Sequence, residues 1–135
     1  QAGVLAAAGL VALEEGWQQH LERDHQVAEA LASALSGVEG VRVRPAQPRT
    51  NIVLVDLEVP AAGGGVSRPL PAHRLVEALQ KEGVLVSAFG PSVVRLVTHR
   101  HVEMDAVEPV VKAFRRALDS VRASHRPSPP PAVGP

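Results

Sequence analysis

Apolar residues recur at helical spacing in four segments of the chain. They stand mainly three, four or seven positions apart in residues 1–13, in the run that follows to residue 35, in residues 71–83, and from about residue 105 to residue 121. This spacing predicts four helices, with glycines after the second and the third as stop signals. The second helix is expected to turn an apolar face to the core through Leu13, Trp17, Leu21, Ala28, Leu31 and Leu35.

Four shorter segments have the pattern of β-strands. Residues 41–45 alternate between valine and arginine, whereas residues 50–57 are almost continuously apolar, as in a central strand. Two more strands are predicted at 84–88 and 92–98, on either side of a Phe-Gly-Pro turn. The order helix, helix, strand, strand, helix, strand, strand, helix predicts a small α+β domain, in which helices cover one face of a largely antiparallel sheet of three or four strands.

Other segments predict irregular structure or helix ends. Residues 60–71 are rich in Gly and Pro and predict a surface loop, and the proline-rich residues 124–135 predict a disordered tail. Asp105, followed three residues later by Glu108, resembles a capping box. Because Pro109 is tolerated only in an early turn, the last helix should begin near residue 105.

Composition and charge exclude several classes of function. The 135 residues include 14 Lys and Arg against 14 Asp and Glu, with 2% aromatic residues, so no nucleic-acid surface is expected. No apolar run reaches the roughly 18 residues of a membrane span. Cysteine is absent and the first residues lack the basic region of a signal peptide, which leads us to expect a cytoplasmic protein. A start at Gln1, inside a helical pattern, suggests a piece of a longer chain.

Arg95 is the residue that most invites a chemical explanation. It lies in a β-branched run, and strand alternation places it on the same face as the apolar Val93 and Val97, opposite Val94 and Leu96. A planar guanidinium in a half-buried cleft suits bidentate binding of a carboxylate. Spacing alone favours the simpler alternative, an arginine paired with a structural acid.

Other polar residues do not assemble a site by spacing. His99 and His101 form an H-x-H pair that would point to one side of a strand, but no third zinc ligand is evident, so a structural or solvated role is favoured. Asn51 could bond a neighbouring loop or a subunit contact, and ordinary chemistry at a strand start is favoured there. The other histidines are not placed as convincing ligands: His20, His25, His73 and His125.

Lysine is scarce. The only two, Lys81 and Lys112, lie on helical faces that the pattern predicts to be exposed. A lysine that forms a Schiff base needs a lowered pKa, which usually comes from burial or a neighbouring cation. By itself the sequence therefore contains no complete catalytic group.

Three stretches together carry a family resemblance. "QAGVLAAAGLVAL", "TNIVLVDL" and "GVLVSAFGPSVVRLVTH", in this order and spacing, resemble the carboxy-terminal part of low-specificity L-threonine aldolases of the β-eliminating lyase family. The resemblance covers roughly residues 1–122, and its most specific piece is "VRLVTH" at 94–99. One departure is His101, where the family commonly has an acid, which puts the local helix capping in doubt.

The resemblance implies a fold, a cofactor and a role for Arg95. Threonine aldolases are pyridoxal-phosphate enzymes of the aminotransferase-like fold (fold type I), and they cleave threonine or allo-threonine to glycine and acetaldehyde. Residues 1–13 would link to a large cofactor domain, residues 14–123 would form the small domain, and residues 124–135 would be the tail. Arg95 would hold the substrate carboxylate. The Schiff-base lysine would lie upstream, so this chain alone would be inactive, and the intact enzyme is expected to be a homo-oligomer, a dimer or tetramer.

Two alternatives remain open at this point. The chain could be a non-catalytic interaction module that keeps the small-domain fold, or it could belong to another pyridoxal-phosphate lyase of the same fold. A lone small domain would also expose the apolar face of its first helix, which predicts self-association.

Overall fold

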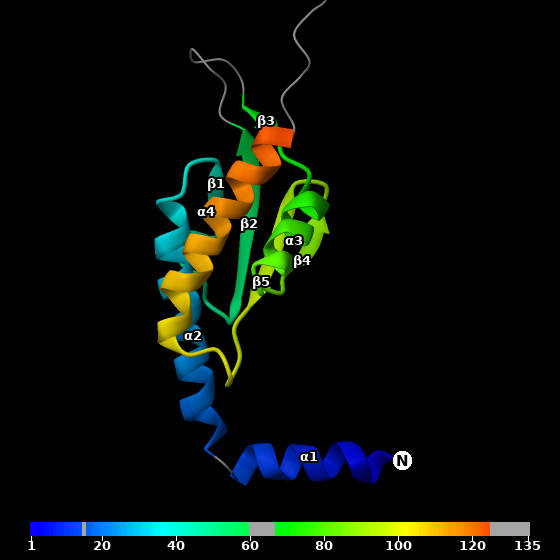
Figure 1. The fold of residues 1–135 in the computed structure, drawn as a ribbon. Helices are drawn as coiled ribbons and strands as arrows, with labels where there is room; N and C mark the ends of the chain where they lie inside the picture. Colours follow the sequence, from blue (N-terminus) through cyan, green and yellow to red (C-terminus); the bar gives the residue numbers. More distant parts are fainter. Residues whose placement is uncertain (15, 60–66, 125–135) are drawn as a thin grey trace, which may run out of the picture.

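One antiparallel sheet organises the molecule. The structure, a computed structural model, describes residues 1–14, 16–59 and 67–124. Four strands pair in the order β1 (Val41–Arg44), β2 (Ile52–Val59), β5 (Val93–Val97) and β4 (Ser87–Gly90), and every pair is antiparallel. A two-residue strand, β3 (Arg68–Pro69), pairs with the end of β2. The predicted α+β class and antiparallel sheet are therefore confirmed (Figure 1).

Three helices cover one face of this sheet. They are α2 (Trp17–Ser36), α3 (Ala72–Lys81) and α4 (Val107–Ser124), and α4 contacts both of the others. The first helix, α1 (Ala2–Glu14), extends away from this layer (Figure 1) and has no buried residue. None of the helices in the described part of the chain is long and apolar enough to cross a membrane.

The core lies between the sheet and the three covering helices. Along β2 and β5, alternate side chains point to the helices, and these are fully or almost fully buried. Phe114 of α4, which is fully buried, is the largest side chain in this layer. The buried strand residues are Val43, Val53, Val55, Leu57, Val94 and Leu96, and the helices add mainly Leu, Val and Ala, as the low aromatic content predicts.

Several predicted boundaries need correction. The fourth helix begins near residue 105 as predicted, at Val107, but a 3-10 turn over Met104–Ala106 precedes it and Asp105 lies inside that turn. The residue directly before this helix is Ala106, so Asp105 is not its N-cap, and the predicted capping box of Asp105 and Glu108 is wrong. Part of the predicted loop 60–71 forms β3, and β4 begins at Ser87 rather than residue 84. Residues 60–66 of that loop and residues 125–135 lie outside the described residues.

The predicted apolar face of the second helix is only half right. Its last turns pack into the core through Val27, Ala28, Leu31, Ala32 and Leu35. The beginning of α2 and the end of α1 do not pack into the core. Their apolar residues Leu13, Trp17 and Leu21 are 64%, 41% and 44% exposed. A glycine at the junction explains the change of direction: Gly16 has a φ of 68°, a left-handed conformation that ends α1 before α2 begins at Trp17.

Gly40, just before β1, is required by its surroundings. Its φ is 76°, and a Cβ there would meet both the Arg122 guanidinium and the Glu58 carbonyl oxygen. Arg122 in turn donates a hydrogen bond to the carbonyl of Glu39. Only glycine allows this close approach of α4 to the start of the sheet.

Candidate functional site

The face of the sheet opposite the helices carries a group of charged side chains. Alternation along the strands puts them there: Arg42 and Arg44 alternate with the inward-facing valines of β1, and Asp56 and Glu58 alternate with those of β2. Arg95 has the same position on β5, between the buried Val94 and Leu96. The prediction that Arg95 lies on the other face from these two residues is confirmed. We refer to this side of the sheet as the open face.

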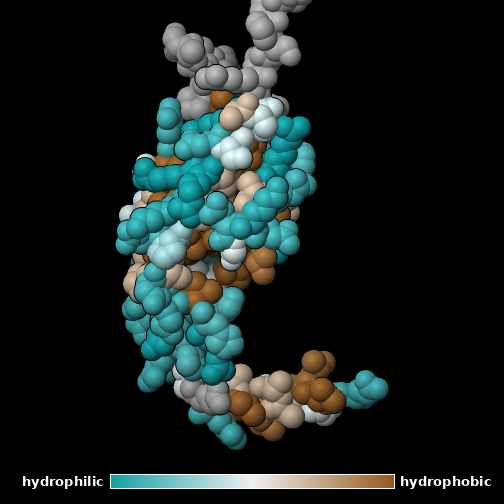
Figure 2. Space-filling model, in the orientation of Figure 1, coloured by the Kyte–Doolittle hydropathy of each residue, from teal (hydrophilic) through white to brown (hydrophobic). Residues whose placement is uncertain are grey.

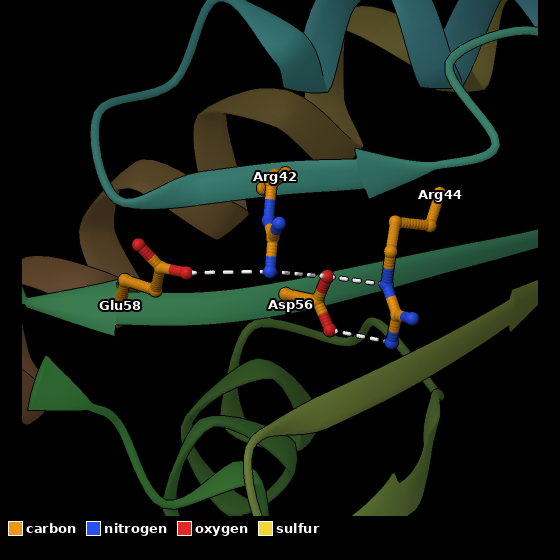
Figure 3. Close-up of polar contacts among 4 residues, drawn as sticks. All are labelled: Arg42, Arg44, Asp56 and Glu58. Atoms are coloured by element: carbon orange, nitrogen blue, oxygen red, sulfur yellow. Dashed lines mark hydrogen bonds and ion pairs between the residues drawn. The ribbon is translucent and has the colours of Figure 1, made fainter. Parts of the chain in front are cut away.

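Four of these side chains form one ion-pair network (Figure 3). Arg44 donates from Nη2 to Oδ1 of Asp56 at 2.7 Å, and its Nε pairs with Oδ2 of the same carboxylate. Arg42 reaches Asp56 at 3.3 Å and Glu58 at 3.5 Å. The Asp56 side chain is 10% exposed, whereas both arginine side chains are more than half exposed. Asp56 is therefore a nearly buried charge compensated by two cations from the neighbouring strand.

Arg95 has different surroundings. It is half-buried, its Nε is buried without a hydrogen-bond partner, and no ion pair joins its guanidinium to another described side chain. Its register partners are Leu54 on β2 and Ser87 on β4. Its guanidinium carbon lies 5.7 Å from the ring centroid of Phe89, a cation–π contact that holds the group against β4 without neutralising it. Within the described residues, Arg95 is therefore not paired with a structural acid, which was the simpler alternative.

The three arginines of the open face thus differ in electrostatic state. Arg44 and Arg95 are both register partners of Leu54, so their backbones stand two strand spacings apart, about 10 Å. Arg44 is engaged by a carboxylate within the chain and Arg95 is not. A buried donor without an acceptor costs free energy, and an anion that supplies two oxygens would remove that cost. The arrangement can bind a carboxylate at Arg95.

The ends of β2 and β5 are tied together next to this site. Asn51 donates from Nδ2 to the Thr98 carbonyl at 2.7 Å, and the Thr98 amide donates to the Asn51 carbonyl at 2.9 Å. The buried Thr98 hydroxyl donates to the carbonyl of Asp24 in α2 at 2.7 Å. Asn51 therefore bonds across to the neighbouring strand, and these contacts fix the strand that carries Arg95.

The histidine pair lies beyond the strand. β5 ends at Val97, so His99 and His101 occupy a turn rather than the predicted strand end. Their rings still meet edge to face at 5.8 Å, and the His101 amide lies 3.3 Å from Nδ1 of His99, to which it donates. Within residues 1–14, 16–59 and 67–124, no three His, Cys, Asp or Glu side chains are grouped to hold a metal ion.

Neither lysine lies on the open face. Lys81 ends α3 and Lys112 lies in α4, the helices that cover the opposite side of the sheet, and both are exposed as predicted. Lys112 pairs with Glu108 at 2.6 Å. The hydrogen bond from Lys112, with its positive charge, lowers the pKa of Glu108. Arg116 in the same helix bonds Glu82, which raises the already high pKa of its guanidinium.

Sequence reasoning missed the Asp56 network. The signal was present in the alternating "VRVR" of 41–44 and in the acids at 56 and 58 that interrupt an apolar strand. The sequence alone does not give the pairing register of the two strands, which sets Arg42 opposite Asp56 and Arg44 opposite Leu54.

Comparison with known proteins agrees with the resemblance. Residues 1–58 match the beta-eliminating lyase family. The chain is 33% identical over 126 residues to low-specificity L-threonine aldolase 1 of Arabidopsis thaliana and 37% identical over 121 residues to the probable low-specificity L-threonine aldolase 2 of that plant. These alignments cover 93% and 89% of this chain, but only 33% and 32% of the relatives, so the chain spans about a third of their length.

Solved structures share the fold at low identity. An aminotransferase, TlmJ, from Streptoalloteichus hindustanus has a TM-score of 0.61 at 18% identity, covering 84% of this chain and 35% of its own. A glutamate decarboxylase from Lactobacillus brevis has a TM-score of 0.59 at 16% identity, covering 78% and 24%. The likeness to an aminotransferase agrees with the predicted aminotransferase-like fold. The predicted fold and resemblance are thus confirmed: the chain is similar over most of its length to part of the low-specificity threonine aldolases of the beta-eliminating lyase family.

Proposed function

We propose that this chain is the carboxy-terminal, carboxylate-binding part of a pyridoxal-phosphate-dependent aldolase that cleaves L-threonine or L-allo-threonine to glycine and acetaldehyde. The observation that carries the proposal is the state of Arg95. It is the arginine of the open face that is half-buried and has no anionic partner among the described side chains, while its neighbours Arg42 and Arg44 are engaged. The threonine aldolase relatives supply the class of substrate.

Arg95 would bind and orient the substrate. Its fork of N–H donors fits the two oxygens of a carboxylate, and two parallel hydrogen bonds restrict how the amino acid can rotate. The Phe89 ring limits the positions of the guanidinium before the substrate arrives. Asp56 would help indirectly, because it occupies Arg42 and Arg44 and leaves one free guanidinium on the open face. The substrate carboxylate then has one preferred position.

The residues of this chain do not fit the attachment of the cofactor. Pyridoxal phosphate is bound through a lysine, and both lysines here lie on helices over the opposite face of the sheet. We therefore derive no chemical step through the cofactor from this chain. The proposal places the cofactor, its lysine and the contacts between subunits of a homo-oligomer in the two thirds of such an enzyme that this chain does not span, and it expects the chain alone to be inactive.

A titration of the carboxylate site tests the role of Arg95. The Nε–H resonance of Arg95 would be followed by NMR while L-threonine is added, with L-threoninamide as the matched compound that lacks the carboxylate. We expect a saturable shift with L-threonine only. Arg95→Lys keeps the charge but loses the fork, so it should weaken binding, and Arg95→Gln should abolish it. An equal shift with the amide, or an unchanged affinity in Arg95→Gln, would refute the assignment.

A second measurement tests the absence of a cofactor lysine. The chain would be incubated with pyridoxal phosphate, reduced with borohydride and analysed by peptide mass mapping. The proposal expects no stoichiometric adduct at Lys81 or Lys112. Such an adduct, accompanied by cleavage of L-threonine, would make this chain an enzyme in its own right.

A further inference from the structure

A second candidate site lies where α1 meets α2, away from Arg95. A cavity of about 610 Å³ opens between the end of α1, the first turns of α2 and the turn after β5. Its walls are mainly apolar, and the large apolar side chains among them are Leu13, Trp17 and Leu21. The residues that line it are Gly9, Ala12, Leu13, Trp17, His20, Leu21, Asp24, His99 and Arg100.

Asp24 distinguishes this cavity from an ordinary apolar depression. The residue is 7% exposed, and its Oδ1 is buried without a hydrogen-bond partner among the described residues. Its position is fixed, because its backbone carbonyl accepts the 2.7 Å bond from the Thr98 hydroxyl. The other buried acid, Asp56, has two arginines. A buried carboxylate without a cation is unfavourable. A positively charged group that entered the cavity and paired with Asp24 would offset this cost.

The charged groups that already line the cavity do not pair with Asp24. His20 and His99 line the cavity, but no hydrogen bond or ion pair joins either ring to Asp24. Arg100 also lines it and has an interaction of its own. Asp24 forms no ion pair with another side chain in the part of the chain that the structure describes. We propose that the cavity binds an arginine or lysine side chain, which a polypeptide segment inserts between apolar neighbours so that its cation meets Asp24.

The apolar surroundings of the cavity favour a polypeptide over a small cation. The cavity continues onto α1, all of whose residues are exposed, with Val4 at 74%, Leu5 at 79% and Leu10 at 60%. Figure 2 shows this hydrophobic surface along α1. An occupant that covers both features must join a cation to several apolar side chains, as a protein segment does. Resting on the proposed function, we assign this segment to the part of a threonine aldolase that this chain does not span.

The protein contains its own reporter for a test. Trp17 is its single tryptophan and lines the cavity, so fluorescence excited in the indole band reports on this site. The chain would be titrated with acetyl-Leu-Arg-Leu-amide and with the same peptide carrying citrulline, which keeps the shape of arginine without its charge. We expect the arginine peptide to bind about tenfold more tightly, as one charge-assisted contact predicts. Agmatine, a small guanidinium compound, should bind more weakly than the arginine peptide.

Variants connect the effect to Asp24. Asp24→Asn should abolish the difference between the arginine and citrulline peptides, whereas Glu22→Gln, an exposed neighbour on α2 outside the cavity, should keep it. Equal binding of the two peptides, no binding of either, or an unchanged difference in Asp24→Asn would overturn the proposal. Agmatine binding as tightly as the peptide would overturn the polypeptide occupant. Because Arg95 does not line this cavity, Arg95→Gln should leave peptide binding intact. A failure of the cavity proposal can therefore be distinguished from a failure of the proposed function, which depends on Arg95.

Discussion

Replacing Arg44 by methionine should destabilise the chain more than neutralising its partner Asp56. The reason is the unequal burial of the pair: the Asp56 side chain is 10% exposed, and that of Arg44 is 54% exposed. Without Arg44 the carboxylate stays in its nearly buried position and keeps only the weaker contact to Arg42 at 3.3 Å. Without the carboxylate charge, both guanidinium groups can turn to water. Methionine keeps the apolar stem of arginine, so the comparison isolates the charge.

The expected magnitudes follow from this geometry. Removing one partner of a fully buried ion pair costs roughly 3–5 kcal/mol, and because Arg42 remains we expect about 2 kcal/mol for Arg44→Met. Asp56→Asn should cost about 1 kcal/mol, since the amide oxygen can still accept one bond from Arg44. Arg42→Met, which removes a longer contact made by a 65% exposed side chain, should cost less than about 1 kcal/mol.

Urea denaturation followed by circular dichroism measures these differences. The urea midpoint should be lowered least by Arg42→Met, more by Asp56→Asn and most by Arg44→Met. The slope of the free energy of unfolding against urea concentration should be unchanged. If Asp56→Asn proved as destabilising as Arg44→Met or more so, the arginines would depend on the acid rather than the reverse, and the reasoning from unequal burial would be wrong.

Three further predictions concern other parts of the molecule. Gly40→Ala should cost about 1–3 kcal/mol in chemical denaturation because of its positive φ and its contacts, whereas Gly3→Ala, in open helical space, should stabilise the chain slightly. The folded-state pKa of Glu108 is lowered by Lys112, so its contribution to stability is present above about pH 4.5 and is lost as the pH falls through the folded pKa. Glu108→Gln should therefore lower the unfolding midpoint slightly at neutral pH and by less as the pH falls below 4.5; an equal loss at neutral and acidic pH would contradict this. Leu5→Gln should reduce self-association in sedimentation velocity, and unchanged association would exclude α1 as its cause.

Hydrophobic spacing predicted most of the fold because most apolar faces here meet an internal partner. The last helix illustrates this, since the apolar spacing predicted there leads to Phe114, Leu118 and Val121 all being buried. Leu13 and Trp17 have the same spacing but stay exposed. Periodicity shows that a face is apolar, and it does not show whether the surface that covers it lies in the same chain.

In the candidate site, too, the sequence predicted the local features and did not predict those that depend on two segments. Strand alternation correctly placed Arg95 opposite Val94 and Leu96, because side-chain direction is a local property. Whether Arg95 or Arg44 has an acid beside it depends on the pairing register between strands, which is a property of two segments. The unpaired state of Arg95, and the unpaired carboxylate of Asp24, could be read only once distant segments were in place.

The central position of β2 has a consequence for the chain before it folds. This strand pairs with β1, β3 and β5, so it gains its partners from segments on both sides of it in the sequence. Until they arrive, the four-residue apolar run 52–55 is free to associate with the same run in another molecule. Asp56 and Glu58 follow this run directly and would place like charges in register in such a stack. We therefore expect the acids that pair with arginines in the folded sheet also to oppose aggregation of this run before the strands have paired.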